Sequence, residues 1–111
     1  MRARTGEIVL IPGSMGSASY VAAGLGDAES FATCQHGAGR AMSRTAARKG
    51  KTSDEVSAVM AELGVTLLSG DPKTVAEEAA FAYKDIEAVM PASASLARPT
   101  KRLTPLGVVK G

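Results

Sequence analysis

The sequence has 111 residues and contains no tryptophan, two tyrosines, two phenylalanines, one cysteine and one histidine. Few large side chains are available for burial, because much of the apolar fraction of 45% is alanine. A chain of this length forms at most one domain with a modest core, so we expect low stability for the chain alone. The single cysteine excludes an internal disulfide, which fits a reducing compartment.

The sequence also lacks long apolar runs and a large excess of charge of either sign. No stretch approaches the roughly twenty apolar residues of a membrane span, and the first residues carry no apolar run of signal-peptide length. We therefore expect a soluble, cytoplasmic protein. Thirteen basic and eleven acidic residues give a net charge of +2, which is too little to indicate nucleic-acid binding by itself. Any affinity for phosphate must come from the local placement of a few groups.

Short β-branched and apolar runs between glycine, proline and serine predict strands. These strands are expected at residues 7–11, 19–22, 65–68 and 102–110. Pro105 interrupts the last of them, which indicates an edge position there.

Capping signals and apolar spacing predict helices between the strands. Thr52 and Glu55 form a capping box, and the apolar stripe that follows it belongs to a core or a docking surface. Helices are expected at residues 40–49, 52–63, from 71 to 82, and from 85 to 90, where Pro91 ends the last one. The fold class is therefore α+β, with short strands and packed helices, and the strand order is left open.

Residues 34–44 hold the densest chemistry of the chain. They include Cys34, His36, two glycines and two arginines. A neutral imidazole can offer a ring-nitrogen lone pair to an electrophile, and glycines allow an anion to approach the backbone amides closely. If Arg40 opens the predicted helix, Arg40 and Arg44 project from one face and the first amides of the helix lie beside His36. The alternative is that a lone histidine between glycines only completes a turn.

A second candidate segment is the loop at residues 12–16, which follows the first predicted strand. Its glycines could turn successive amides toward an anion, and Ser14, Ser17 and Ser19 add hydroxyl groups. The loop lacks the lysine and hydroxyl ending of a Walker motif. The alternative interpretation is a plain strand–turn–strand connection.

Three motifs together resemble one family. His-Gly-Ala-Gly-Arg at residues 36–40, followed by Met-Ser-Arg, resembles the guanylylation motif of the RtcB family of RNA-splicing ligases. Ile-Pro-Gly-Ser-Met-Gly at residues 11–16 and the terminal Pro-Leu-Gly-Val-Val-Lys-Gly agree with the family in order and approximate spacing. Tyr-Lys-Asp at residues 83–85 is similar as well. The likeness covers nearly the whole chain but only the C-terminal part of a family member, so residues 1–111 are expected to be its nucleotide-binding portion.

The resemblance implies a ligase that joins RNA ending in a 2′,3′-cyclic phosphate or 3′-phosphate to RNA beginning with a 5′-hydroxyl, using GTP and Mn²⁺. His36 would attack the α-phosphate of GTP and carry GMP as a phosphoramidate, which would then activate the RNA 3′-phosphate. Tyr83 and Lys110 would contact guanine, although a lone tyrosine can also be a packing residue and a terminal lysine a frayed tail. The remaining nucleotide-binding residues implied are Gly13, Ser14, Met15, Gly16, Ser19, Gly37, Ala38, Gly39 and Arg40, with Arg44 as a further phosphate contact.

Metal ligands are scarce in the sequence. Cys34 and His36 lack further partners, and the family's Mn²⁺ ligands lie upstream of the matched region, so we assign no metal ligand in this chain. Adjacent Glu77 and Glu78 point about 100° apart on a helix and are not assigned as a catalytic pair. Two hypotheses follow. The chain is either the nucleotide-binding portion of an RNA ligase, inactive without a metal-bearing portion in cis or in trans, or a catalytically silent remnant that binds a nucleotide or a protein.

Overall fold

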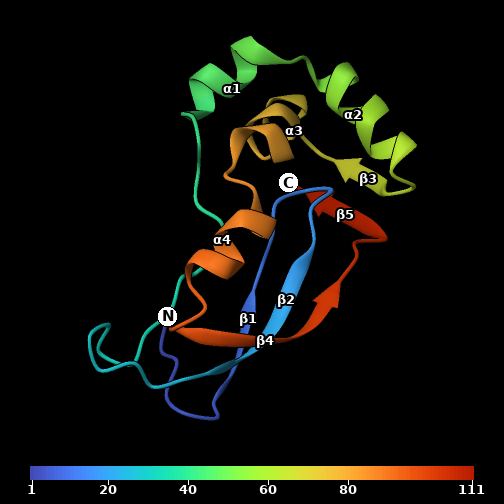
Figure 1. The fold of residues 1–111 in the computed structure, drawn as a ribbon. Coiled ribbons are helices and arrows are strands. Elements are labelled where there is room, and N and C mark those ends of the chain that lie inside the picture. Colours follow the sequence, from blue (N-terminus) through green and yellow to red (C-terminus); the bar gives the residue numbers. More distant parts are fainter.

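The computed structural model describes all of residues 1–111, which form four α-helices and two small sheets. Figure 1 shows their arrangement. This confirms the α+β class. In chain order the elements are β1 (Ile8–Ile11), β2 (Ser19–Gly24), α1 (Arg44–Gly50), α2 (Ser53–Glu62), β3 (Thr66–Ser69), α3 (Pro72–Glu77), the 3₁₀ turn η1 (Ala80–Ala82), α4 (Ile86–Ala92), β4 (Ala97–Leu103) and β5 (Gly107–Lys110).

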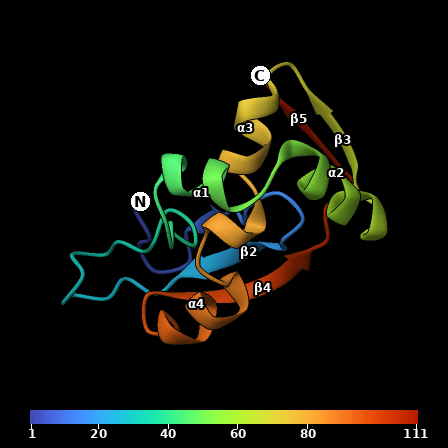
Figure 2. The same ribbon diagram turned by 90° about the horizontal axis from the view of Figure 1, so that it is seen from above.

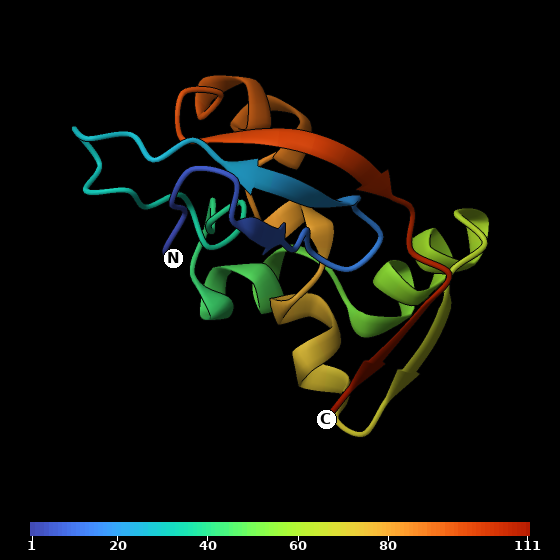
Figure 3. The ribbon, with the colours of Figure 1, turned by 90° about the horizontal axis from the view of Figure 1, so that it is seen from below.

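The larger sheet is antiparallel, with strand order β1–β2–β4. Leu10 lies opposite Val21, and Val21 lies opposite Lys101. Alternate residues of β1 face opposite sides, because successive side chains of a strand alternate. Val9 and Ile11 are buried on one face, where residues of α4 share their core cluster. Figure 3 shows α4 beside this sheet.

The smaller sheet pairs β3 with β5 in parallel. Its apolar cluster combines residues of α2, α3 and the loop after β1, including Met15, Val56 and Met60. The capping box of α2 forms as predicted, since the Thr52 hydroxyl accepts the amide of Glu55 and the Glu55 carboxylate accepts the amide of Thr52. Val59 stays 43% exposed, so only part of the predicted apolar stripe enters this core.

The two clusters make an elongated molecule, with principal extents of 44 × 26 × 22 Å. Figure 2 shows α4 and the larger sheet on one side, and α1, α3 and the β3–β5 pair on the other. Four segments connect these parts: the loop after β1, the residues between Ala38 and α1, the residues between α3 and α4, and the link from β4 to β5. A site built where these segments meet depends on both cores.

Two helix predictions are wrong in their bounds. The helix expected at residues 40–49 begins only at Arg44, because Arg40 pairs in an extended bridge with Tyr83 and the Ser43 hydroxyl caps the helix by accepting the amide of Ala46. Arg40 and Arg44 therefore do not share a helix face, and the helix does not start directly after Gly39. The helix expected to continue to residue 82 ends at Glu77, before the separate turn η1.

Two predictions that depended on proline also need correction. Pro91 lies inside α4, which continues to Ala92, because a proline near the end of a helix removes a single intrahelical hydrogen bond. The strand expected at residues 102–110 is two strands in different sheets. β4 begins earlier, at Ala97, and the segment around Pro105 redirects the chain into β5. No helix is long and apolar enough to span a bilayer.

An acid-sensitive contact ties α4 to the larger sheet. The Tyr20 hydroxyl donates to Glu87 Oε2 at 2.6 Å, and Arg102 pairs with Glu87 Oε1 at 2.8 Å. These hydrogen bonds, first from Tyr20 and then from Arg102, hold the pKa of Glu87 below the ordinary 4.5. A lowered carboxyl pKa stabilises the fold above the unfolded-state pKa, and that contribution is lost as pH falls through the folded pKa.

We therefore expect Glu87→Gln to flatten the loss of stability between about pH 5 and pH 3, a window set by the ordinary carboxyl pKa and its downward shift. The measurement is the thermal midpoint as a function of pH. Glu62→Gln, at an exposed residue without an ion pair, is the matched control and should leave the acid limb unchanged. An unchanged slope in Glu87→Gln would show that this contact does not link stability to pH.

Candidate functional site

The loop after β1 connects the two cores. Ile11, which is fully buried, belongs to the larger cluster, and Met15 belongs to the smaller one. Between them the amide of Gly13 donates to Ser19 Oγ at 3.0 Å, and the hydroxyls of Ser14 and Ser17 lie 3.1 Å apart. Anchored at both ends, the loop cannot move without disturbing a core. The Ser19 hydroxyl thus holds the loop in place by accepting the Gly13 amide.

The His-Gly-Ala-Gly segment runs directly beside this loop. A Cβ on Gly37 would lie 3.1 Å from the carbonyl oxygen of Pro12, which shows how closely the two backbones approach. Ala38 is buried in the larger core, whereas His36 is exposed and its ring makes no hydrogen bond within the chain. The amides of Gly37, Ala38 and Gly39 donate to no protein acceptor. The segment therefore offers a free imidazole and three free amide donors.

Arg40 positions Tyr83 at a further side of the site. Its guanidinium donates to the carbonyl of Glu77 at 2.7 Å and to the Tyr83 hydroxyl at 3.1 Å, and lies 4.8 Å from the centre of the Tyr83 ring. Its Nε donates to the carbonyl of Met42 at 3.0 Å. A guanidinium with these partners is committed to positioning Tyr83 and is not free for a phosphate.

Glu78 completes this cluster, and its role was missed in the sequence. The Tyr83 hydroxyl donates to Glu78 Oε2, and Arg40 Nη1 lies 3.8 Å from Glu78 Oε1. Burial raises the pKa of Tyr83 above its ordinary value, and the Glu78 carboxylate raises it further, while Arg40 opposes the shift. Hydrogen bonds with Arg40 and Glu78 therefore fix the position of the Tyr83 hydroxyl. The only sequence feature that could have indicated this role is the position of Glu78, five residues before Tyr83 of the Tyr-Lys-Asp motif.

These segments enclose a cavity of about 570 Å³. It lies where the connections between the two cores meet, which is a common place for ligand pockets. The terminal strand β5 brings Lys110 to it. The lining residues are Pro12, Gly13, Ser14, Met15, His36, Gly37, Ala38, Gly39, Glu78, Tyr83 and Lys110.

Four residues that the resemblance assigned to the nucleotide, Gly16, Ser19, Arg40 and Arg44, do not line the cavity. Gly16 turns the loop with φ +81°, Ser19 accepts the Gly13 amide, and Arg40 orients Tyr83. Ser19 and Arg40 thus hold lining residues in place through hydrogen bonds. Arg44 is exposed at the start of α1, where its Nε lies 3.9 Å from the carboxylate of Glu78.

The donor set of the chain does not suit a divalent metal. No group of three or more His, Cys, Asp or Glu side chains is placed to hold an ion. Cys34 is buried in the larger core, and burial raises the pKa of its thiol, so it favours the thiol over the metal-binding thiolate. Mn²⁺, which needs several such ligands, does not fit the residues of this chain.

The fold and the cavity thus define an α+β protein that places one histidine and a lysine around a glycine-lined hollow. A family model described as "tRNA-splicing ligase RtcB" matches residues 1–111. The chain is 43% identical over 111 residues to an "RNA-splicing ligase RtcB" of Mycobacterium tuberculosis, covering 98% of this chain and 26% of the relative. It is also 43% identical over 110 residues to a "tRNA-splicing ligase RtcB" of Pyrobaculum aerophilum, covering 96% of this chain and 23% of the relative.

The chain therefore belongs to the RtcB family of RNA-splicing ligases. It spans about a quarter of the length of these two relatives.

Proposed function

We propose that the chain is the nucleotide-binding portion of a GTP-dependent RNA ligase in which His36 is the nucleophile. The observation that carries this proposal is the cavity of about 570 Å³ that places His36 beside the Pro12–Met15 loop and Lys110. Its volume lies within the range of roughly 300–1,000 Å³ of small-molecule sites. Membership of the RtcB family supports ligation of RNA ends as the reaction.

The lining groups suit a nucleotide triphosphate. The free amides of Gly37, Ala38 and Gly39 can donate to phosphate oxygens. Lys110 supplies a positive charge, and the neutral Tyr83 ring offers a flat surface on which guanine can stack. Ser14 adds a hydroxyl group to the lining, and Met15, which belongs to the smaller apolar cluster, adds an apolar side chain.

His36 supplies the chemical step in this proposal. Its ring has no hydrogen-bond partner in the chain, so a nitrogen lone pair is available to attack the α-phosphorus of GTP, and the bond to pyrophosphate breaks. An oxygen of the RNA 3′-phosphate then attacks the same phosphorus and releases the imidazole. The 5′-hydroxyl of the second RNA finally attacks the activated 3′-phosphate, and GMP leaves as the phosphodiester forms.

Catalysis requires a further polypeptide portion in this proposal. The chain does not supply a ligand set for Mn²⁺, and it is about a quarter of the length of the Mycobacterium tuberculosis and Pyrobaculum aerophilum relatives. Ile8 and Leu10 leave 76% and 62% of their surface exposed on one face of the edge strand β1, directly before the loop that lines the cavity. A metal-bearing portion that covers this face, in cis or in trans, would lie next to His36 and bury the apolar surface.

The test is transfer of label from [α-³²P]GTP to protein in the presence of Mn²⁺. The chain alone is expected to give little or no label. Joined to the N-terminal portion of the Mycobacterium tuberculosis relative, it is expected to give acid-labile label that His36→Ala abolishes. Glu29→Ala, an exposed substitution in the preceding loop, is the control and should label normally. Label that persists in His36→Ala would reject His36 as the nucleophile. Strong label on the isolated chain would show that the metal-bearing portion is not needed.

A second candidate function is a catalytically silent remnant that binds a nucleotide or a protein. The missing metal ligands and the exposed apolar face of β1 favour it. In that case no combination of portions gives label, while titration of GMP still perturbs the NMR signals of the cavity-lining residues.

A further inference from the structure

A second hollow, of about 220 Å³, lies between the end of α1 and the starts of α2 and α3. Its lining is rich in positive charge and hydroxyl groups. The residues are Arg48, Lys51, Thr52, Ser53, Pro72, Lys73 and Ala76. None of them belongs to the cavity that contains His36.

Two of its three cations are not neutralised within the chain. Neither Lys51 nor Lys73 forms an ion pair, and the nearest recorded partner of Lys51 Nζ is the ring of Phe81 at 5.7 Å. Arg48 is paired, because its Nη1 lies 2.6 Å from Glu77 Oε1. The hollow therefore carries an unbalanced positive charge from two lysines.

Two neighbouring carboxylates are already engaged, and Asp54, which follows Ser53, lines a different hollow. Glu55 Oε1 accepts both the amide and the hydroxyl of Thr52. Asp71 caps α3 by accepting the amide of Lys73, and neither carboxylate lines the hollow. Hydrogen-bonded in this way, they do not replace an external anion as partners of the lysine ammonium groups.

The hollow is connected to the histidine cavity by the same helix. Arg44, Arg48 and Lys51 are spaced four and three residues apart, so they follow one side of α1 and its C-cap. The spacing covers about 10 Å at the usual helical rise. Arg44 lies 3.9 Å from the carboxylate of Glu78, which lines the cavity. Positive groups thus run from the rim of the cavity to the second hollow.

We infer that this hollow, defined by Lys51 and Lys73, binds backbone phosphate of single-stranded RNA, and that the exposed Arg44 leads the strand from it toward the histidine cavity. The choice of RNA rests on the proposed ligase function, whereas the anion site rests on the geometry alone. Lysines contact phosphate as point charges without reading base edges, so the binding is independent of sequence.

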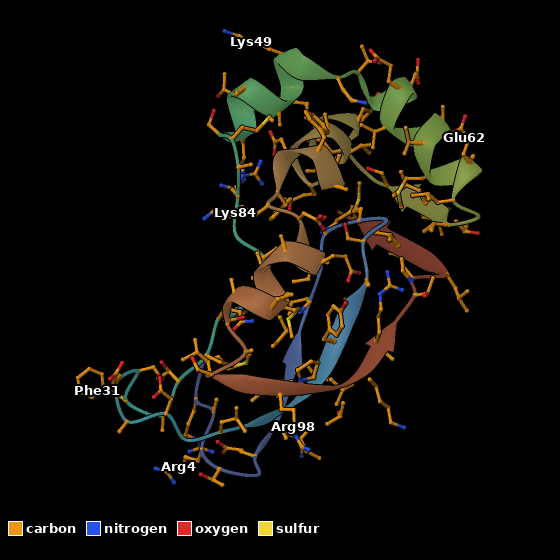
Figure 4. All side chains as sticks on the ribbon, in the orientation of Figure 1. Arg4, Phe31, Lys49, Glu62, Lys84 and Arg98 are labelled. Atoms are coloured by element: carbon orange, nitrogen blue, oxygen red, sulfur yellow. The ribbon has the colours of Figure 1, made fainter.

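The test is the fluorescence anisotropy of a labelled single-stranded RNA 12-mer titrated with the 111-residue chain. The Lys51→Gln/Lys73→Gln variant removes two charges from the hollow. The Arg98→Gln/Lys101→Gln variant removes two charges from exposed, unpaired residues of β4, far from α1, as the positions of Lys49 and Arg98 in Figure 4 indicate. Both variants have the same net charge, so only position distinguishes them.

The Lys51→Gln/Lys73→Gln variant should bind RNA about 10-fold more weakly at 0.1 M salt. The slope of log affinity against log salt concentration should become shallower by about 1.4, as the loss of two phosphate contacts predicts. The β4 control should change binding by less than about 2-fold. Lys51→Arg/Lys73→Arg should restore binding, because the charge is kept. Thermal midpoints of all variants check folding.

Equal losses in the two charge-matched variants would overturn the proposal, because they would show a response to net charge alone. Equal affinity for polyglutamate that also depends on Lys51 and Lys73 would reject RNA in favour of an acidic peptide. NMR shifts with inorganic phosphate that are not reproduced by RNA would reject a backbone site in favour of a free anion. Labelling of the joined protein by [α-³²P]GTP tests His36 and requires no RNA, so failure of the nucleophile proposal and failure of this one are separate results.

Discussion

Gly13→Ala should collapse the histidine cavity and destabilise the chain together. A Cβ at this position would lie 2.0 Å from the carbonyl oxygen of Ala18 and 3.0 Å from its carbonyl carbon. Both are backbone atoms that cannot rotate away, so the loop must shift and break the hydrogen bond from the Gly13 amide to Ser19. Overpacking of this kind costs about 1–3 kcal/mol and here acts on a segment that belongs to both cores.

The measurement combines urea unfolding with titration of GMP followed by NMR. We expect the free energy of unfolding to fall by about 3 kcal/mol, the upper end of the range for overpacking. We also expect that GMP causes no NMR shifts at the cavity-lining residues. Gly70→Ala is the matched control, because its nearest contact would be an ordinary 3.5 Å. Wild-type stability and GMP response in Gly13→Ala would show that the loop can move freely and that its anchoring does not shape the cavity.

Arg40→Met should remove the group that holds Tyr83 in the cavity wall. The substitution keeps most of the apolar stem but deletes the donors to Glu77, Met42 and Tyr83. It also leaves Glu78 without its nearest ion-pair partner. Hydrogen bonds from a charged donor contribute roughly 1.5–3 kcal/mol each to stability, and partial exposure reduces this contribution. We therefore expect the free energy of unfolding to fall by about 3 kcal/mol in total.

Arg44→Met is the control, because Arg44 lies 3.9 Å from the same carboxylate but its side chain is 65% exposed. An exposed pair of this kind contributes about 0–1 kcal/mol. The pKa of Tyr83 should rise further in Arg40→Met, since Arg40 opposes the rise caused by burial and Glu78. Ultraviolet titration of the phenol measures that change. Equal stability losses in the two arginine variants would contradict the positioning role of Arg40.

The sequence by itself determined the fold class, the approximate position of most elements and the segments that line the cavity. Local signals were sufficient for these, because alternation predicts a strand such as β1 and a capping box predicts the start of α2. The order of the motifs also identified the family. Each of these features depends on residues close together in the chain.

Only the tertiary structure decided where helix α1 begins, how the last strand divides and which polar groups are free. Arg40 has ordinary helix propensity, but its bridge with Tyr83 forms between residues far apart in sequence and takes it out of the helix. The same long-range contacts turn Arg40 into a support and bring Glu78 to the cavity. They also leave Lys51 and Lys73 without ion pairs beside a second hollow. Packing between distant segments fixes the partner of each charge, and local sequence does not encode it.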